Sequence, residues 1–253
     1  MTIKTLADGT SYKKAHAHDW EDPDCTIKGR VKIYRKIDGI RAIRNKIGAV
    51  WSRNSKPLPH CDHLNFQDAE IFRNSWNETS SILGRIDAPT IALTQENVYE
   101  LRDGFIDPRL YIGWADNPSN ENLEALMHKY IAQGDEGLIV RVEHKGKVLW
   151  WKIVPYKYAD VIITGFKEGT NKNKGKCGSI ASNWGSAGSM VEDCLQDHNI
   201  KGDANIRTWL WQNRNSLIGK VMQVRYREKT EAGKLRFPSL VRLRTDKNEE
   251  SFD

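Results

Sequence analysis

Residues 34–57 read YRKIDGIRAIRNKIGAVWSRNSKP, a stretch with many charged side chains. Four residues with chemical or conformational interest fall within six positions: Lys36, Asp38, Gly39 and Arg41. Apolar and polar residues alternate on both sides of the Asp-Gly pair, which predicts two strands around a turn. Asp-Gly is a favourable turn sequence. The stretch is therefore explained either as a charged hairpin or as the position of a reactive lysine.

The composition is that of a folded protein with a basic surface. The chain has 253 residues, enough for one large domain or two modest ones. Hydrophobic residues make up 39% and include nine tryptophans, which can fill real cores and argues against disorder. The formal net charge of +6 fits a polyanionic partner such as nucleic acid.

Cysteines and termini exclude several classes of protein. None of the four cysteines belongs to a CxxC pair, which favours free thiols in a reducing compartment. HCDH at residues 60–63 is better explained as a surface turn after Pro57 and Pro59 than as a zinc site, because structural zinc requires four ligands. The first residues lack the apolar core of a signal peptide, and no segment approaches the length of a membrane span.

Periodicity predicts mixed secondary structure. Residues 1–28 are polar and mixed in character, and HAHDWEDPD (16–24) is expected to be loop. Helices are predicted at residues 75–85, 121–134 and near 205–219, and strands at 30–39, 40–54, 66–74, 136–144, 147–154, 159–169, 220–230 and 234–247. Turns are expected at Lys145-Gly146 and Ala232-Gly233, while the basic segment 170–189 is rich in loop. Short strands with glycine turns after residue 158 suggest a small barrel.

Four further segments follow residues 34–57 in a defined order. They are DAEIF (68–72), EGLIVR (136–141), WWKIVP (150–155) and RLRTDK (242–247). Together with KIDGIR (36–41), this order resembles the covalent nucleotidyltransferases and in particular the ATP-dependent DNA ligases. The resemblance covers most of residues 30–247, and GKLRFPSLVRLRTDK (233–247) is similar to ligase OB domains beyond the RxDK core.

The resemblance implies an α+β fold with two domains. An adenylation (nucleotidyltransferase) domain with antiparallel sheets and flanking helices would occupy residues 1–158. A small all-β OB-fold barrel would occupy residues 159–253, and a hinge near residue 158 would let the second domain close over the first.

The resemblance also implies covalent catalysis by Lys36, together with Asp38 in the turn that holds it. In this family a lysine amine attacks the α-phosphate of ATP and displaces pyrophosphate. The amine is a nucleophile only when unprotonated, so its ordinary pKa of about 10.4 must be lowered by burial, a metal or neighbouring cations. Arg35, Arg41 and Lys152 are the cations expected beside it, and they would also stabilise phosphate charge in the transition state.

Other residues match positions that hold substrate. Arg41 matches the arginine that contacts ribose or the nick, and Lys152 matches the lysine on the α-phosphate. Ser52 and Arg53 match the pair at the 5′-phosphate of the nick, where a guanidinium suits a phosphate. Glu70 matches the glutamate that contacts the ribose hydroxyls.

Glu136 matches the glutamate that helps to bind the catalytic Mg²⁺, with Glu70 as a second carboxylate. A hard cation prefers oxygen ligands and takes many of them from substrate phosphates, so few protein ligands suffice. Mn²⁺ is a possible substitute. The implied cofactors are therefore ATP and Mg²⁺.

The second half carries the remaining matches. Arg244, Asp246 and Lys247 match RxDK, which in this family orients the pyrophosphate leaving group. Basic residues expected along the DNA backbone are Lys172, Lys174, Arg225 and Arg227. A lysine-rich loop that serves only solubility remains the alternative for residues 167–176.

The sequence departs from the family pattern at three places. Ala69 replaces the glycine of a DGE strand, and Val154 replaces the second lysine of a WxKxKP strand, a contact that Lys157 could supply. The aromatic residue that stacks on adenine is not evident. Tyr99 is the first candidate, with Tyr111 and Phe105 behind it.

With no DNA-binding domain ahead of the matched segments, the chain resembles the minimal ligases of viruses, phages and some bacteria. That implies a monomer acting on nicked duplex DNA in the cytoplasm, or in the host cell interior if a virus or phage encodes it. An mRNA capping guanylyltransferase shares KxDGxR, and an RNA ligase is a further alternative. A non-enzymatic OB-type nucleic-acid-binding protein is the alternative from another class.

Overall fold

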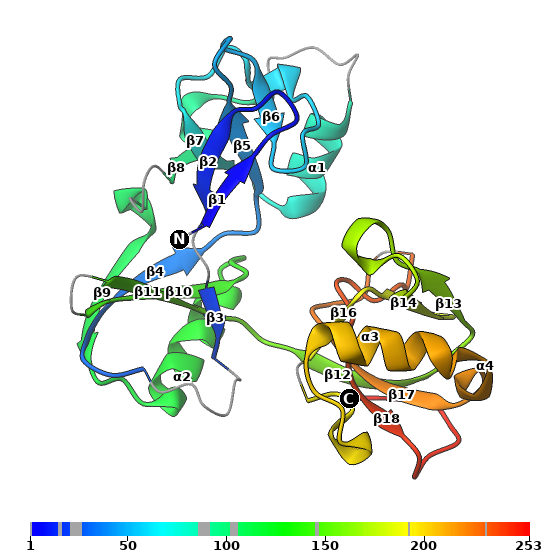
Figure 1. The fold of residues 1–253 in the computed structure, drawn as a ribbon. Coiled ribbons are helices and arrows are strands. Elements are labelled where there is room, and N and C mark those ends of the chain that lie inside the picture. Colours follow the sequence, from blue (N-terminus) through cyan, green and yellow to red (C-terminus); the bar gives the residue numbers. More distant parts are fainter. Residues whose placement is uncertain are drawn as a thin grey trace. The chain divides into compact units, whose positions relative to one another are not determined.

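The computed structural model describes residues 2–14, 17–20, 27–85, 92–101, 106–144, 147–191, 193–230 and 232–253. The chain divides into two compact units, Met1–Val154 and Pro155–Asp253 (Figure 1). Antiparallel sheets predominate in both units, and the helices are few, as an α+β protein should have. None of the helices in the described part of the chain is long and apolar enough to cross a membrane.

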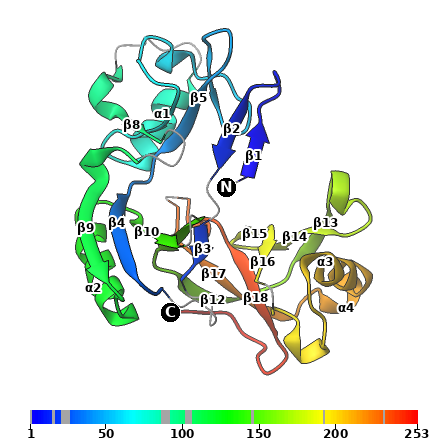
Figure 2. The same ribbon diagram turned by 60° about the vertical axis from the view of Figure 1, so that its left-hand side comes forward.

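The first unit contains a five-stranded sheet in the order β3-β11-β10-β4-β9. Its strands are β3 (Ala17–Asp19), β4 (Arg30–Lys36), β9 (Tyr111–Asp116), β10 (Gly137–His144) and β11 (Lys147–Ile153). Helix α2 (Asn120–Ile131) lies against one face of this sheet (Figure 2). Leu123 and Met127 of α2 pack in one buried cluster with Leu138 and Val140 of β10. The helix predicted at residues 121–134 is therefore confirmed, and its apolar side covers one face of the sheet.

A second sheet of the first unit has the order β6-β5-β7-β8. Its strands are β5 (Ile40–Arg44), β6 (Val50–Ser52), β7 (Asp68–Ile71) and β8 (Val98–Glu100). Helix α1 (Trp76–Gly84) begins at Ser75, whose side chain accepts a hydrogen bond from the Glu78 backbone N–H. Short 3₁₀ turns lie at Pro59–Cys61, Gln95–Asn97 and Pro108–Leu110.

The Asp38-Gly39 segment is not a hairpin turn, contrary to the sequence-based prediction. Strands β4 and β5 flank it as predicted, but they belong to different sheets. Residues 37–39 cross from one sheet to the other, and Gly39 passes close to β7. A Cβ added at Gly39 would lie 2.5 Å from the Ile71 carbonyl oxygen, so the glycine is needed for close approach rather than for a tight turn.

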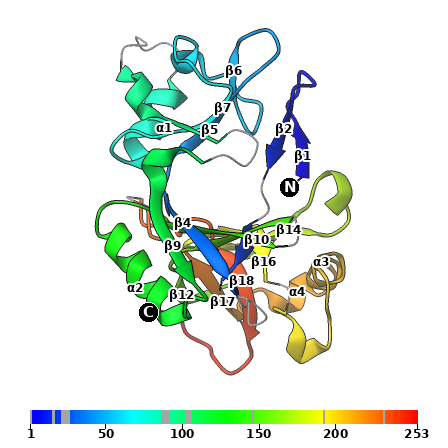
Figure 3. The same cartoon turned by 90° about the vertical axis from the view of Figure 1, so that its left-hand side faces the viewer.

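The N-terminal residues form three strands that were not predicted, and one of them, β3, lies in the segment expected to be loop. β1 (Thr2–Thr5) and β2 (Ser11–Lys14) form an antiparallel hairpin, labelled beside the second sheet in Figure 3. β3 pairs in parallel with β11 at the edge of the first sheet. The polar composition hid the local pairing of β1 with β2, and the partner of β3 lies far away in sequence. The expected turn at Lys145-Gly146 lies outside the described residues.

The described residues of the second unit form two sheets and two helices. The strands are β12 (Lys157–Ile162), β13 (Gly165–Glu168), β14 (Cys177–Ser182), β15 (Gly185–Ala187), β16 (Ser189–Met190), β17 (Val221–Tyr226), β18 (Ser239–Arg244) and β19 (Ser251–Phe252). They form a five-stranded sheet, β16-β18-β17-β12-β19, and a three-stranded sheet, β13-β14-β15. The strand pairs of the described residues form these two sheets and no closed barrel, so the predicted barrel is not seen as such.

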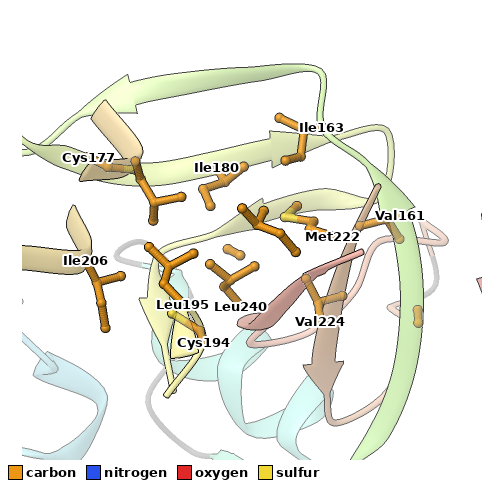
Figure 4. Packing of buried hydrophobic residues seen from close by; sticks show 14 of the residues in the cluster. Val161, Ile163, Cys177, Ile180, Cys194, Leu195, Ile206, Met222, Val224 and Leu240 are labelled. Carbon is orange, nitrogen blue, oxygen red and sulfur yellow. The ribbon is translucent and has the colours of Figure 1, made fainter. Parts of the chain in front are cut away.

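The core of this unit lies between the sheets and helix α3 (Asp203–Gln212), which is followed by α4 (Arg214–Leu217). Ile180, Ile206, Met222 and Leu240 come from three strands and α3 and are all fully buried (Figure 4). Further 3₁₀ turns occur at Asn171–Asn173 and Gln196–His198.

The division between the units falls earlier than the predicted boundary at residues 158–159. Strand β12 starts at Lys157, which pairs with Tyr226 of β17, and the pairing continues to Ile162. The whole strand therefore belongs to the second unit. The first unit ends at Val154, which is fully buried.

Candidate active site

Lys36 is the last residue of β4 and forms an ion pair with Glu136. The Lys36 side chain is 25% exposed and that of Glu136 is 21% exposed. The backbones hold this pair in place, because the Glu136 N–H donates to the Lys36 carbonyl at 2.7 Å and Gly137 pairs with Lys36 across the strands. A Cβ at Gly137 would collide with the Ile153 carbonyl, so the backbone geometry requires glycine at position 137.

A row of polar side chains crosses the second sheet. Arg41 of β5 pairs with Glu70 of β7, which pairs with Tyr99 of β8. Residues directly opposite each other in a sheet point to the same side, so the three side chains share one face. The Arg41 guanidinium donates two hydrogen bonds to Asp68, at 2.8 and 2.6 Å, and lies 5.3 Å from the centre of the Tyr12 ring.

Glu70 connects this row with Lys36. Burial raises the pKa of Glu70 to about 7, and the neighbouring carboxylate of Glu136 acts in the same direction. Lys36, Arg41 and Arg53 lower the pKa against that effect. These charges interact with one carboxyl group, so the structure brings Lys36, Arg41, Arg53 and Glu136, four of the predicted residues, near Glu70.

Lys152 lies on the Lys36 face of the first sheet. Tyr34, two residues before Lys36, pairs with Ile139, and Ile139 pairs with Lys152. Because alternate residues of a strand share a face, Lys36 and Lys152 point to the same side. Lys152 is half-buried between Trp151 and Ile153, which are in the core on the other side.

Arg35 is not one of the cations beside Lys36, contrary to the expectation from sequence. Its guanidinium donates to Asp135 at 2.7 and 2.9 Å, and the Asp135 side chain is 1% exposed. Arg35 also faces the Tyr130 ring of α2, which covers the opposite side of the sheet. Alternation along β4 explains the error, because adjacent residues of a strand point to opposite faces.

Three further candidate residues of the segment 34–57 differ in their exposure to solvent. Asp38 is half-buried in the segment between the sheets. Ser52 is buried, and its hydroxyl accepts hydrogen bonds from the backbone N–H groups of Asn54 at 3.4 Å and Lys56 at 3.1 Å. Arg53 is exposed in that turn. Ser52 therefore shapes the turn that presents Arg53.

Two tyrosines remain as candidates to stack on a base. Tyr99 has its ring 4.4 Å from the Arg109 guanidinium. Tyr111 is 44% exposed, and its ring centre lies 5.4 Å from that of Tyr34, on the face of the sheet that carries Lys36. Phe105 lies outside the described residues. Val154, where the family pattern has a second lysine, is buried, and Lys157 is an exposed residue of the second unit.

HCDH at residues 60–63 has structural roles. His60 and His63 interact through Nε2 with the backbone carbonyls of Arg85 and Leu93, respectively. Cys61 is buried, which raises the pKa of its thiol to about 12. In the described part of the chain, no group of three or more His, Cys, Asp or Glu side chains is arranged to hold a metal.

In the second unit, the RxDK residues are assembled around Asp160 of β12. Arg244 donates to Asp160 at 3.1 and 2.9 Å and to Asp246 at 2.8 and 2.7 Å. Lys247 donates to Asp160 at 2.6 Å. The hydrogen bonds with Asp246 raise the pKa of Arg244, and the same bonds lower the pKa of Asp246.

The basic residues predicted to contact DNA occupy two kinds of position. Lys172 and Lys174 are exposed at a 3₁₀ turn. Arg225 and Arg227 each lie 4.3 Å from the centre of the Tyr156 ring, and Arg227 donates to the Pro155 carbonyl at 3.1 Å. These two arginines therefore also hold the first residues of the second unit.

Comparisons with known proteins show that solved structures share the fold of this chain. No protein-family model matches the chain, and no curated protein matches it in sequence. The solved structure named Pmar-Lig_Pre has a TM-score of 0.58 at 18% identity, covering 92% of this chain and 67% of that chain. A structure from the work "DNA binding with a minimal scaffold: Structure-function analysis of Lig E DNA ligases" has a TM-score of 0.56 at 18% identity, covering 96% and 100%.

The chain has the fold of the Lig E DNA ligases. This agrees with the resemblance of its motifs to the ATP-dependent ligases. A further structure, Pmar-Lig_PreS3, matches with a TM-score of 0.57 at 17% identity over 96% of this chain. Within this ligase fold, Asp68, Asp160 and Tyr12 interact with predicted site residues but were missed in sequence. Only Asp68 had a signal, since it precedes Glu70 by two residues and shares its face.

Proposed function

We propose that this chain is an ATP-dependent DNA ligase that seals nicks between a 5′-phosphate and a 3′-hydroxyl in duplex DNA. The observation that carries the proposal is the Lys36–Glu136 ion pair, whose charges act on Glu70, as does that of Arg41, in a chain with a ligase fold. The first unit would be the adenylation domain and the second the OB domain.

The first step would be adenylylation of Lys36. The Nζ lone pair attacks the α-phosphorus of ATP, an N–P bond forms, and the bond from α-phosphorus to the bridging oxygen breaks. Pyrophosphate leaves with the electron pair. The attacking ammonium must lose a proton, and Glu136 Oε2 contacts Nζ and can hold it.

Two transfers would follow. The 5′-phosphate of the nick attacks the lysyl-AMP, which forms an adenylylated DNA end and frees Lys36. The 3′-hydroxyl then attacks that 5′-phosphate and AMP leaves. Arg53 is exposed and could bind the 5′-phosphate, while Arg41 is fixed by Asp68 in an orientation suited to ribose or the nick.

The donor set near Lys36 fits Mg²⁺, with Mn²⁺ as a substitute. Glu136 and Glu70 interact electrostatically and offer carboxylate oxygens, the ligands that a hard cation prefers. Glu136 would hold the ion, and Glu70 is the second donor. The ion would neutralise phosphate charge during transfer.

Nucleotide recognition would use both sheets of the first unit. Lys152 would contact the α-phosphate, and Glu70 in its ionised form would accept hydrogen bonds from the ribose hydroxyls. We favour Tyr111 over Tyr99 as the residue that stacks on adenine, because Tyr111 is more open and lies on the Lys36 face.

The second unit would act on phosphates and on DNA. Arg244, Asp246 and Lys247 would orient the pyrophosphate leaving group. Residues proposed to contact the DNA backbone are Lys172, Lys174, Arg225 and Arg227. The protein would work as a monomer in the cytoplasm, or inside the host cell if a virus or phage encodes it.

The proposal is tested on a duplex DNA that carries one 5′-phosphorylated nick. With ATP and Mg²⁺, the protein should convert it to a sealed strand, and Lys36→Ala should not. Sealing of nicked RNA but not DNA would indicate an RNA ligase. Transfer of GMP from GTP to Lys36 would indicate a capping enzyme, and no nucleotide transfer would leave a nucleic-acid-binding protein.

A further inference from the structure

Asp160 is a buried carboxylate that gathers side chains from the end of β18 and from the segment after it. Its side chain is 4% exposed. It accepts hydrogen bonds from Arg244 at 3.1 and 2.9 Å, from Lys247 at 2.6 Å and from the Ser251 hydroxyl at 3.0 Å. A buried carboxylate with several charge-assisted partners is an arrangement that fixes geometry.

Asp160 binds two cations, Arg244 and Lys247, that differ in burial and in their other partners. Arg244 lies at the end of β18 and is 10% exposed, and its other edge is bound by Asp246. Lys247 lies in the turn that follows, with a side chain that is 39% exposed and that also contacts Ser251 at 3.2 Å. A lysine on a turn has a flexible stem with many rotamers, so the contact with Asp160 restricts the position of its ammonium group.

We propose that Asp160 is a positioning residue that holds Arg244 and Lys247 as one preformed binding element for the β- and γ-phosphates of the nucleotide. This role rests on the proposed function. Asp160 is too buried to meet the nucleotide and acts through the two cations. Two cations held at a fixed spacing lose less conformational freedom when a diphosphate binds than two mobile ones.

The role predicts an effect limited to the step that uses the triphosphate. Lys36 adenylylation releases pyrophosphate, whereas sealing of a nick that already carries AMP on its 5′-phosphate involves no triphosphate. Asp160→Asn keeps the shape of the side chain but removes the charge that holds Arg244 and Lys247.

The experiment measures both reactions on full-length protein. Asp160→Asn should lower kcat/KM for ATP in Lys36 adenylylation by about 10- to 100-fold, with a raised KM. Sealing of the pre-adenylylated nick should stay within about twofold of the unsubstituted protein. Asp160→Glu, which keeps the charge, should recover part of the first step and guards against a variant that loses the fold.

Asp203→Asn is the matched control. Asp203 binds Arg207 at 2.8 Å in the same unit, and Arg207 is 10% exposed, so this variant also removes the carboxylate from a buried arginine. Asp203→Asn should change the rates of Lys36 adenylylation and of sealing of the pre-adenylylated nick by the same factor. Equal losses in both reactions for Asp160→Asn, or none, would overturn the positioning role. Absence of adenylylation in the unsubstituted protein would overturn the proposed function itself.

Discussion

The two units each contain a cluster of charged side chains. The clusters differ in their exposure to solvent and in how many hydrogen bonds their charged groups make within the protein. In the first unit, Lys36 and Glu136 are about one quarter and one fifth exposed, and burial raises the pKa of Glu70 to about 7. In the second unit, Asp160 is 4% exposed and receives hydrogen bonds from three side chains.

The difference separates two kinds of site. A carboxyl group whose charge changes near neutral pH, beside an ion pair that is partly open to solvent, is suited to bind and transform a charged substrate. A closed network keeps its side chains in a set arrangement and changes little until a competing anion arrives. On this account the first cluster performs the chemistry, and the second prepares cations for it.

Removing the partner of Lys36 should have the largest effect. Glu136→Gln keeps the size of the side chain but removes the carboxylate that contacts Nζ. Lys36 adenylylation should fall by about 10²- to 10³-fold, as it does when one preorganised electrostatic group is lost from an active site. Rapid-quench measurement of lysyl-AMP gives the rate, and a loss below about threefold would assign the chemistry elsewhere.

Lys152 and Lys157 test which lysine serves the α-phosphate. Lys152 lies on the Lys36 face of the first sheet, whereas Lys157 is an exposed residue of the second unit. Lys152→Ala should lower adenylylation by about 10²-fold, and Lys157→Ala should change it by less than about threefold. The reverse order would show that the WWKIVP register has been assigned to the wrong lysine.

Glu70 should make the first step depend on pH. Because the pKa of Glu70 is raised to about 7, the carboxylate that accepts ribose hydroxyls forms only above that pH. kcat/KM for ATP should rise by up to about tenfold per pH unit below this value and level off above it. In Glu70→Gln, kcat/KM for ATP should not change with pH in this range. An unchanged pH dependence in the variant would contradict the role of Glu70.

The stability of the fold should change with pH in the direction opposite to activity. A carboxyl group whose pKa is raised by folding, here from 4.5 to about 7, favours the folded state fully below about pH 4.5. That contribution is lost as the pH rises through 7. Glu70→Gln should remove it, which thermal unfolding of the variant at several pH values would detect.

Gly39 should show the smallest functional effect and a clear structural one. A Cβ there would lie 2.5 Å from the Ile71 carbonyl oxygen and 2.7 Å from Glu70 Cγ. Gly39→Ala should cost about 1–3 kcal/mol of unfolding free energy through overpacking. Gly48→Ala is the control, because Gly48 has φ +90° and open space around it, and it should cost only about 1 kcal/mol. Equal costs would show that close approach is not what Gly39 provides.

The proximity of several candidate site residues was predictable from short sequence motifs. Lys36, Glu70 and Glu136 were each found from a short motif, and the structure places them in one electrostatic environment. Helix α2 was predicted at residues 121–134 from its apolar periodicity, and Gly134, which has φ +95°, follows the helix.

The errors share a physical cause, which is pairing between distant segments. An Asp-Gly turn between two strands looks like a hairpin until the partners of each strand are known, and β4 and β5 pair with other strands. The pairing of β3 with β11 and the contacts of Asp160 with Arg244 and Lys247 likewise join segments that no local pattern connects. Arg35 was placed beside Lys36 because strand alternation was not applied to it.

The most direct test of the central claim is covalent labelling of Lys36 by ATP. Incubation with α-³²P-ATP and Mg²⁺, followed by denaturing electrophoresis, should give a labelled protein whose label is acid-labile and is released as ATP by pyrophosphate. The label should map to Lys36 and be absent in Lys36→Ala. Label that persists in Lys36→Ala, or no label in the unsubstituted protein, would contradict the account.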